Sequence, residues 1–376
     1  MNRVGPVGVG PVGVGIVGAG VISDTYLENL TSFPDIRVVA IGDLRPEAAR
    51  AKAAAHGVAV SGAVDVVLGN PDVEIVVNLT IPAAHADVAA RALDAGKHIW
   101  NEKPLALDRP SGRAVLDTAA AARLRVGCAP DTFLGAGLQA VRGLVEAGAI
   151  GDPLTALALL QSQGPDAWHP NPAFLFQAGA GPLFDLGPYY LTALVQILGP
   201  VGSVAAVAST AHGRRTIGSG PRAGETFEVT AATHVGALVS FVGGASAQVL
   251  FSFDSALPRI LFELAGRDGT MILPDPNGFD GEVGVRRSGA ASTETAARTT
   301  ARSSRGTGVL DMARAIREGR PHRASGELAY HVLDALLAIG ESAESGTFVP
   351  VHSRAPVVDP LPPGWDPLTA TTMAAR

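Results

Sequence analysis

Hydrophobic and polar positions divide the chain into two stretches with different periodicities. Over the first 129 residues, short apolar runs alternate with segments in which apolar residues recur at helical spacing. Strands are predicted at residues 12–17, 37–42, 74–79, 98–100 and 124–128, and helices at 21–30, 46–56, 85–95 and 111–122. This alternation is typical of a parallel sheet covered by helices on both faces. The first stretch is therefore predicted to be an α/β domain that binds its ligand at the carboxyl ends of the strands.

Beyond Pro130 the pattern changes to strand-like runs joined by turns. A helix is predicted at 138–147, and strands at 154–161, 203–210, 226–234, 237–241, 247–254, 260–265 and 270–273. Strands joined by turns rather than by crossover helices favour an antiparallel sheet.

Two stretches imitate membrane segments. Residues 186–211 carry no charge over 26 positions, but Pro188, Gly199 and Pro200 interrupt them, and the pieces predict a helix at 190–198 followed by a strand. The first 22 residues contain a single charge, Arg3, yet seven of the twenty residues 4–23 are glycine and no leucine core is present. We therefore expect a cytoplasmic protein with no membrane partner.

A glycine-rich turn follows the first predicted strand. Gly18-x-Gly20-x-x-Ser23 leads from that strand into a helix, whereas the literal fingerprint matches beginning at Gly8 and Gly13 lack this context. Gly18 permits the tight turn, and Gly20 lets the backbone approach a pyrophosphate at the helix N-terminus. The turn predicts a dinucleotide site.

Asp43 follows the second predicted strand, where an acid in such a site accepts hydrogen bonds from the adenosine ribose. Its charge would repel a 2′-phosphate and so favours NAD. Arg45, two residues on, could instead hold a 2′-phosphate, so NADP stays open. An exposed turn acid is the plain alternative for Asp43.

Composition excludes several other classes of function. Lys and Arg total 29 against 35 Asp and Glu, a net charge of −6 that provides no footprint for nucleic acid. The single cysteine, Cys128, rules out an internal disulfide and a thiolate zinc cage, and the nine histidines have no ligand spacing, so no metal is expected.

The glycine turn and several later motifs resemble those of the glucose–fructose oxidoreductase/inositol dehydrogenase/rhizopine-catabolism family of NAD(P)-dependent oxidoreductases. The matching segments are GIVGAGVIS, TIPAAH, AGKHIWNEKPLA, GAGPLFDLGPYYLTAL and DMARAIREGRPHRASGELAYHVLD. The resemblance spans about residues 12–350.

This resemblance implies a particular domain organisation. A flexible tail at 1–11 precedes an NAD(P)-binding Rossmann domain at 12–129, and an α+β substrate domain with a large, mostly antiparallel sheet occupies 130–354, followed by a Pro-rich tail at 355–376. The open face of that sheet commonly forms an oligomer interface in the family. A homodimer or homotetramer is therefore expected.

The resemblance also assigns candidate catalytic residues. Lys103 of the E-K-P motif would move the hydroxyl proton and steady the developing alkoxide. Tyr189 stands where many family members carry His, and Lys103 could lower the pKa of its phenol; Asp185, one helical turn earlier, would orient the pair. A role as a buried core aromatic is the alternative for Tyr189. The adjacent Tyr190 points elsewhere on the same predicted helix, so Tyr189 is preferred.

The remaining candidates contact cofactor or substrate. His85 would, by resemblance, lie near the cofactor ribose or nicotinamide, with a packing histidine as the alternative. Trp168 and His169 would line the pocket, since aromatic faces suit sugar rings, or else form a plain Pro-braced loop. The full cofactor set is Gly18, Gly20, Val21, Ile22, Asp43, Arg45, Thr80, Pro82, His85, Glu102 and Lys103.

The predicted activity is hydride transfer between nicotinamide and a sugar, polyol or related hydroxy compound. Two alternatives are an NAD-dependent glycosidase with a transient internal redox cycle and a cofactor-binding sensor without catalysis, which the tyrosine at position 189 keeps open. The substrate itself is not disclosed by the sequence.

Overall fold

The computed structural model describes residues 10–371, so most of the predicted N-terminal tail, residues 1–9, lies outside the described residues. The described chain forms two compact units. The first comprises residues 10–135, 301–330 and 358–371, and the second residues 136–300 and 331–357. Residues 301–330 and 358–371 thus belong to the first unit, whereas the predicted boundaries place 301–330 in the substrate domain and 358–371 in the C-terminal tail.

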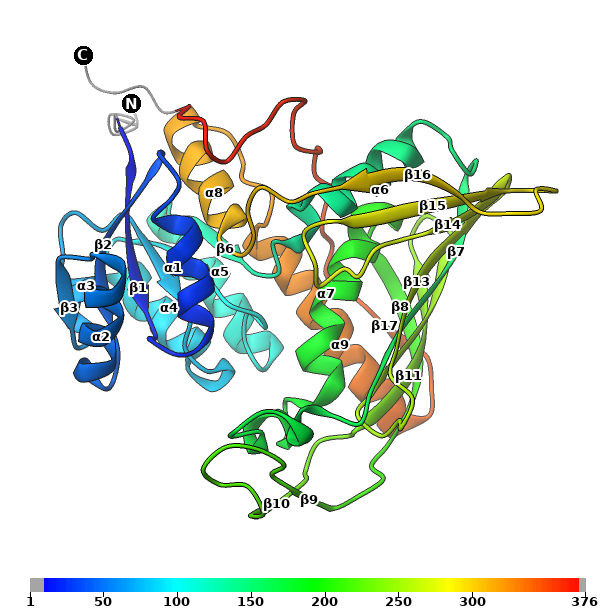
Figure 1. Ribbon diagram of the computed structural model, residues 1–376, viewed down its shortest axis with the longest axis horizontal. Helices are drawn as coiled ribbons and strands as arrows, with labels where there is room; N and C mark the ends of the chain where they lie inside the picture. Colours follow the sequence, from blue (N-terminus) through cyan, green and yellow to red (C-terminus); the bar gives the residue numbers. More distant parts are fainter. Residues whose placement is uncertain (1–9, 372–376) are drawn as a thin grey trace. The chain divides into compact units, whose positions relative to one another are not determined.

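The first unit contains a six-stranded parallel sheet in the order β3-β2-β1-β4-β5-β6 (Figure 1). Its strands are β1 Val12–Val17, β2 Ile36–Gly42, β3 Val60–Gly62, β4 Ile75–Asn78, β5 His98–Asn101 and β6 Val126–Cys128. The helices between them are α1 Ile22–Leu30, α2 Pro46–His56, α3 Asp65–Leu68, α4 His85–Asp94 and α5 Arg109–Ala122. The predicted α/β domain is confirmed, and among the strands and α-helices of residues 12–129 β3 and α3 are additions.

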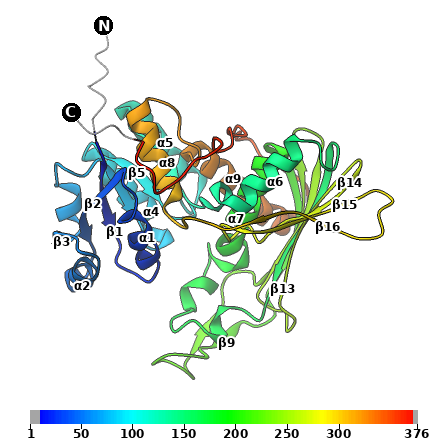
Figure 2. The ribbon, with the colours of Figure 1, turned by 45° about the horizontal axis from the view of Figure 1, so that its top comes forward.

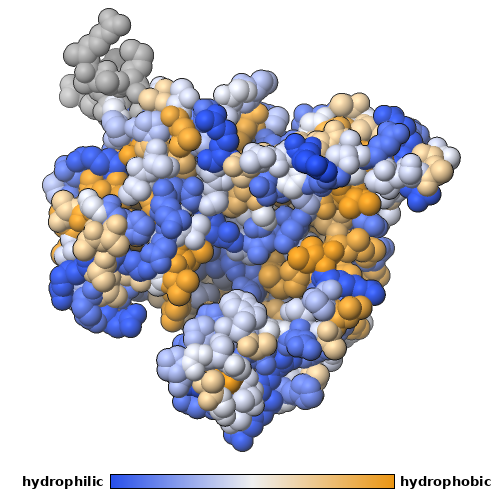
Figure 3. Space-filling view, viewed as in Figure 1, coloured by the Kyte–Doolittle hydropathy of each residue, from blue (hydrophilic) through white to orange (hydrophobic). Residues whose placement is uncertain are grey.

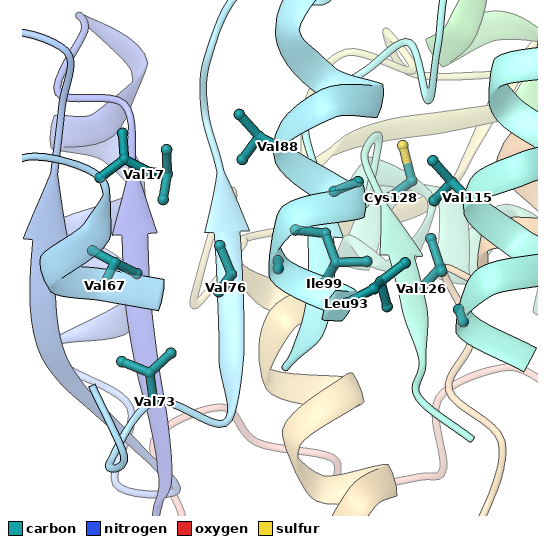
Figure 4. Close-up of a cluster of buried hydrophobic side chains, with 14 of the residues drawn as sticks. Val17, Val67, Val73, Val76, Val88, Leu93, Ile99, Val115, Val126 and Cys128 are labelled. Atoms are coloured by element: carbon teal, nitrogen blue, oxygen red, sulfur yellow. The ribbon is translucent and has the colours of Figure 1, made fainter. Parts of the chain in front are cut away.

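Side chains of successive strand residues fill the two faces of this sheet alternately. On one face, Val17, Val76, Ile99 and Val126 pack with Val67 of α3 and with residues of α4 and α5 (Figure 4). The strands are buried on both faces, which explains their continuous Val and Ile runs.

Trp100 is a large side chain that two glycines accommodate in the first unit. A Cβ on Gly127, its neighbour on β6, would lie 2.6 Å from the Trp100 ring, and one on Gly308 would lie 2.1 Å from it. Gly308 lies in α8 (Thr307–Glu318), whose first N–H groups are bound by Asp131: its Oδ2 accepts from Gly306 N and Gly308 N, both at 2.9 Å. Burial raises the pKa of Asp131 to about 6.

The C-terminal segment covers a buried ion pair. Arg314 of α8 donates Nε–H to Asp35 Oδ2 at 2.8 Å, and both side chains are buried. The carbonyls of Asp366 and Thr369 accept from Arg314 Nη2, and Thr371 N donates to Asp35. These bonds compensate the desolvated charges, so the segment predicted as a Pro-rich tail is part of the packing of the first unit.

The second unit is built on a nine-stranded, mostly antiparallel sheet in the order β16-β15-β14-β13-β7-β12-β11-β8-β17, in which only β7 and β12 pair in parallel. Its strands are β7 Pro153–Gln161, β8 Val201–Ser209, β11 His234–Phe241, β12 Ser246–Ser252, β13 Arg259–Gly266, β14 Gly269–Ile272, β15 Gly281–Arg287, β16 Glu294–Thr299 and β17 Val349–Pro350. A separate hairpin pairs β9 Arg214–Thr216 with β10 Thr226–Glu228, beyond the end of the large sheet in Figure 2. The predicted fold class is confirmed.

Several predicted boundaries in the second unit are wrong. The single strand predicted at 226–234 is the short β10 followed by a loop and the start of β11, and β15 and β16, rich in Gly, Arg and Thr, were not predicted. Helices are α6 Ala136–Glu146, α7 Gly181–Leu198 and α9 Gly326–Ser345, which begins in the first unit. Helix α7 continues through Pro188, predicted to interrupt it, because every residue from Gly187 to Gln196 is buried and packing outweighs the lost hydrogen bond.

We predict that Gly308→Ala lowers the free energy of unfolding by about 1–3 kcal/mol, since the added methyl group overlaps the Trp100 ring. Urea denaturation followed by intrinsic fluorescence measures the change. Gly340→Ala is the matched control: no atom lies within 4 Å of its added Cβ, and stability there should stay equal or rise by up to about 1 kcal/mol. Equal stability of the Gly308→Ala and wild-type proteins would contradict the packing argument.

Candidate functional site

The glycine turn after β1 is held by the acid that follows β2. One carboxylate oxygen of Asp43 accepts the Ala19 N–H at 2.7 Å and the other accepts the Arg45 N–H at 2.8 Å. Gly18 has φ +107°, and a Cβ there would lie 2.7 Å from the backbone of Leu79. The turn therefore requires glycine at position 18, and Asp43 fixes its conformation.

The start of α1 stays open to a ligand. Val21, at the N-cap position, makes no side-chain hydrogen bond and is 87% exposed, and a Cβ on Gly20 would meet no atom within 4 Å. At the start of α1 the Ser23 N–H donates to Gly20 O at 3.1 Å and the Asp24 N–H donates to Val21 O at 3.3 Å. An anion there would therefore interact with the N–H groups that precede Ser23 and with the helix dipole. Ser23 is buried and donates its hydroxyl to Gly20 O at 2.6 Å, which closes the turn. These features fit a pyrophosphate group.

Asp43 and Arg45 differ strongly in exposure. The Asp43 side chain is 15% exposed and the Arg45 side chain 73%, and Arg45 Nε lies 4.0 Å from Asp43 Oδ1. Asp43 is thus a built-in part of the turn, not an exposed turn acid, whereas the Arg45 guanidinium lies in solvent.

A buried amide pair joins the ends of β4 and β5. Asn78 and Asn101 are register partners on the two strands, and Asn78 Nδ2 donates to Asn101 Oδ1 at 2.9 Å. Asn78 Oδ1 accepts the Thr80 hydroxyl at 2.6 Å. Sequence analysis did not single out Asn78, although an asparagine ending an apolar strand was the available signal.

His85 connects the two loops that follow these strands. Its Nδ1 lies 2.6 Å from Pro104 O and its Nε2 lies 3.0 Å from Thr80 O, and the ring is fully buried. Burial lowers the pKa of His85, and the two carbonyl contacts oppose that shift. Both ring nitrogens face main-chain carbonyls, so the geometry favours the packing role that was the alternative for this residue. Pro82 lies in the short 3₁₀ turn Pro82–Ala84 between these contacts.

Glu102 and Lys103 follow β5 directly. Glu102 Oε1 accepts the Tyr26 hydroxyl at 2.8 Å, and Oε2 accepts the Lys103 N–H at 3.0 Å. The Lys103 side chain is partly exposed, and the Lys103–Pro104 peptide bond is cis. Glu102, predicted to contact a cofactor, is thus engaged within the protein, and Tyr26 is a partner that sequence analysis missed.

In the second unit, helix α7 carries Asp185 and Tyr189 one turn apart. Asp185 is partly exposed and Tyr189 is buried. The adjacent Tyr190 packs between the rings of Phe251 and Phe262, with centroid distances of 5.3 and 5.8 Å. Burial raises the pKa of Tyr190, and its ring contacts make it a core aromatic, while Tyr189, 7% exposed, is also buried.

Trp168 and His169 lie on a loop before α7 that Arg215 anchors. The Arg215 guanidinium donates to Asp166 Oδ1 at 3.0 Å and Gln163 O at 2.8 Å, and it forms an ion pair with Asp254. Trp168 is 66% exposed, and its ring meets the His169 ring edge-on at 5.7 Å. The contacts of Arg215 thus fix the loop to neighbouring segments of the second unit, and the Trp168 ring of the loop is exposed to solvent.

The described residues contain no group of three or more His, Cys, Asp or Glu side chains placed to hold a metal ion. Within residues 10–371, every helix is too short or too polar to cross a bilayer.

Two family models match the chain. One, an oxidoreductase family with an NAD-binding Rossmann fold, matches residues 12–129, and the other, the GFO/IDH/MocA C-terminal domain, matches residues 138–272. Inositol 2-dehydrogenase of Rhizobium meliloti is 30% identical over 146 residues, which cover 39% of this chain and 43% of that protein. 1,5-Anhydro-D-fructose reductase of Ensifer adhaerens is 26% identical over 241 residues, covering 62% and 67%. The match thus spans less than half of the first relative.

Solved structures with the same fold include an NAD-binding oxidoreductase from Klebsiella pneumoniae, with a TM-score of 0.79 and 22% identity, which covers 91% of this chain and 100% of that one. Levoglucosan dehydrogenase in complex with NADH and L-sorbose has a TM-score of 0.77 and 23% identity, covering 91% and 99%.

Proposed function

From the premise that the chain belongs to the GFO/IDH/MocA family of oxidoreductases with an NAD-binding Rossmann fold, we propose that it transfers a hydride between nicotinamide and a sugar, polyol or related hydroxy compound. The observation that carries this proposal is the glycine turn that leads into α1 and whose backbone is bound by the Asp43 carboxylate. Relatives named as dehydrogenases and reductases of such compounds support it.

NAD is the proposed cofactor, with NADP as the weaker alternative. The turn, Val21 and Ile22 would hold the pyrophosphate, and the Asp43 carboxylate would accept from the ribose hydroxyls and repel a 2′-phosphate. The exposed Arg45 would contribute only to NADP binding. Thr80, Pro82 and His85 would shape the wall of the site through the carbonyl and amide contacts described above.

Lys103, Tyr189 and Asp185 are proposed to handle the proton. When bound, nicotinamide supplies the hydride donor or acceptor. The Lys103 ammonium would donate to the substrate oxygen and stabilise negative charge on it, and Tyr189 would relay the proton, with Asp185 orienting the pair. The position of Lys103 directly after β5, at the sheet edge where such domains bind ligands, supports this assignment. Trp168 and His169 would contact the substrate, because exposed aromatic faces suit the C–H face of a sugar.

The large sheet is proposed to form the contact between copies of the chain. One row of residues crosses its open face in register: Ala205, Leu238, Gln248, Leu157, Glu263 and Ile272. Leu238 is 50% exposed, and Val207 and Leu250 continue the apolar surface in the adjoining row. On the other side of the first row, a single polar row carries Ser203, Ser240, Ser246 and Thr155. Figure 3 shows apolar side chains, in orange, over the region of this sheet. An apolar centre with a polar border is typical of an interface.

The first test is titration with NAD and NADP. Asp43→Ala should weaken NAD binding about tenfold or more and reduce discrimination against NADP, because both the ribose acceptor and the bond to Ala19 are lost. Cofactor fluorescence measures both affinities. An unchanged preference would transfer the role to Arg45, and failure of the wild-type protein to bind either dinucleotide would overturn the proposed function.

The second test removes the proposed proton donor. Lys103→Ala should lower kcat about a hundredfold with a panel of sugars and polyols and leave NAD affinity nearly intact. Lys97→Ala is the control, since Lys97 Nζ bonds the Asn70 carbonyl at 2.8 Å and Lys97 is not part of the proposed site. Normal turnover by Lys103→Ala would contradict the assignment. Turnover of a glycoside without net NADH would indicate the glycosidase alternative, and binding without any turnover would indicate the sensor.

The third test concerns assembly. Leu238→Glu should convert a dimer into a monomer, or a tetramer into a smaller assembly, because a charge would be desolvated beside the exposed apolar residues of this face. Sedimentation velocity reports the change. Val242→Glu, an exposed position between β11 and β12, should leave the assembly unchanged. A monomeric wild-type protein would refute the proposed interface.

A further inference from the structure

A chain of hydrogen bonds runs from the core of the first unit to the backbone of Lys103. Trp100 Nε1–H donates to Tyr26 Oη at 3.3 Å, and the Tyr26 hydroxyl donates to Glu102 Oε1 at 2.8 Å. Glu102 Oε2 in turn accepts the Lys103 N–H at 3.0 Å. Three bonds thus connect an indole in the core to the main chain of the residue proposed to move the proton.

The direction of these bonds is determined by chemistry. An indole N–H can only donate, so the Tyr26 oxygen accepts from Trp100 and its hydrogen is directed to Glu102. Burial, together with the nearby carboxylates of Glu102 and Asp131, raises the pKa of Tyr26 well above its ordinary value. The phenol therefore stays protonated and remains a donor to the carboxylate.

Each member of the chain is held by packing. Tyr26 and Trp100 are fully buried, and Trp100 is confined by Gly127 and Gly308. Tyr26 belongs to α1, the helix that begins at the glycine turn. Glu102 is 9% exposed and has no freedom to turn toward solvent without breaking both of its bonds.

We propose that Tyr26 is a positioning residue for Lys103, acting through the Glu102 carboxylate. The proposal rests on the role assigned to Lys103 under the proposed function. Tyr26 holds Glu102 in the rotamer that binds the Lys103 N–H, and the bond fixes the main chain from which the Lys103 side chain extends. The same phenol joins α1 to the end of β5, so the pyrophosphate-binding helix and the proton donor share one rigid support.

Tyr26→Phe removes the hydroxyl and keeps the ring. Glu102 Oε1 then lacks a donor in a buried place and the carboxylate turns, which releases the Lys103 N–H. Site-resolved amide hydrogen exchange should show the Lys103 amide exchanging about tenfold faster or more. The Glu102 amide, bonded to Asn78 O at 2.9 Å, should keep its rate.

Tyr330→Phe is the matched control, since the Tyr330 ring lies against the Arg113 guanidinium and outside this hydrogen-bond chain. It should leave the Lys103 amide unchanged. An unchanged Lys103 rate in Tyr26→Phe overturns the inference, as does an equal acceleration of the Lys103 and Glu102 amides, which indicates general loosening. These readouts need no substrate, so they stand even where the proposed activity fails.

Kinetics then test whether Tyr26 acts through Glu102. Tyr26→Phe should lower kcat about tenfold with KM for the substrate changed less than threefold, and Glu102→Gln should lower it comparably. In the double variant the two losses should not multiply, because both interrupt one chain. Multiplicative losses would show that Tyr26 acts independently and would overturn the inference.

Discussion

The in-register pairing of β4 with β5 is the constraint on which the candidate site depends. It places Asn78 opposite Asn101, and their buried amide bond sets where both strands end. Thr80, Glu102 and the carbonyl contacts of His85 are all defined from these two strand ends. A shift in register would turn the asparagines to opposite faces and leave buried amides without partners. The geometry of the loops therefore follows from the pairing of the strands.

Carboxylates bound to main-chain N–H groups are the second organising feature of the first unit. Asp43 binds Ala19 and Arg45, Glu102 binds Lys103, and Asp131 binds two residues at the start of α8. In each case the carboxylate fixes the backbone of a turn or of a helix end. Charged side chains thus position the main chain of the first unit, and charge-assisted hydrogen bonds of this kind are stronger than neutral ones.

The second unit uses its sheet differently. One face packs α7, whose Tyr190 lies among aromatic residues, while the other carries a row across six strands in which Leu157, Leu238 and Ile272 are exposed and Gln248 and Glu263 are polar. The aromatic loop before α7 depends on Arg215, which lies on the separate β9–β10 hairpin. A loop held by an ion pair can vary in sequence without disturbing the sheet, which is consistent with one fold serving many substrates.

The sequence by itself determined the elements, the class of both domains and the glycine turn with its acid, because strand and helix periodicity and turn chemistry are local properties of the chain. It missed β15 and β16, whose polar and glycine-rich residues carry little periodic signal, and it misplaced the start of α7, where burial overrides Pro188. Only the tertiary structure decided that Tyr26 meets Glu102, 76 residues away, that Asp131 binds Gly308, 177 residues away, and that residues 358–371 return to the first unit. Such contacts depend on which faces of distant segments pack together, and no pattern within either segment records its partner.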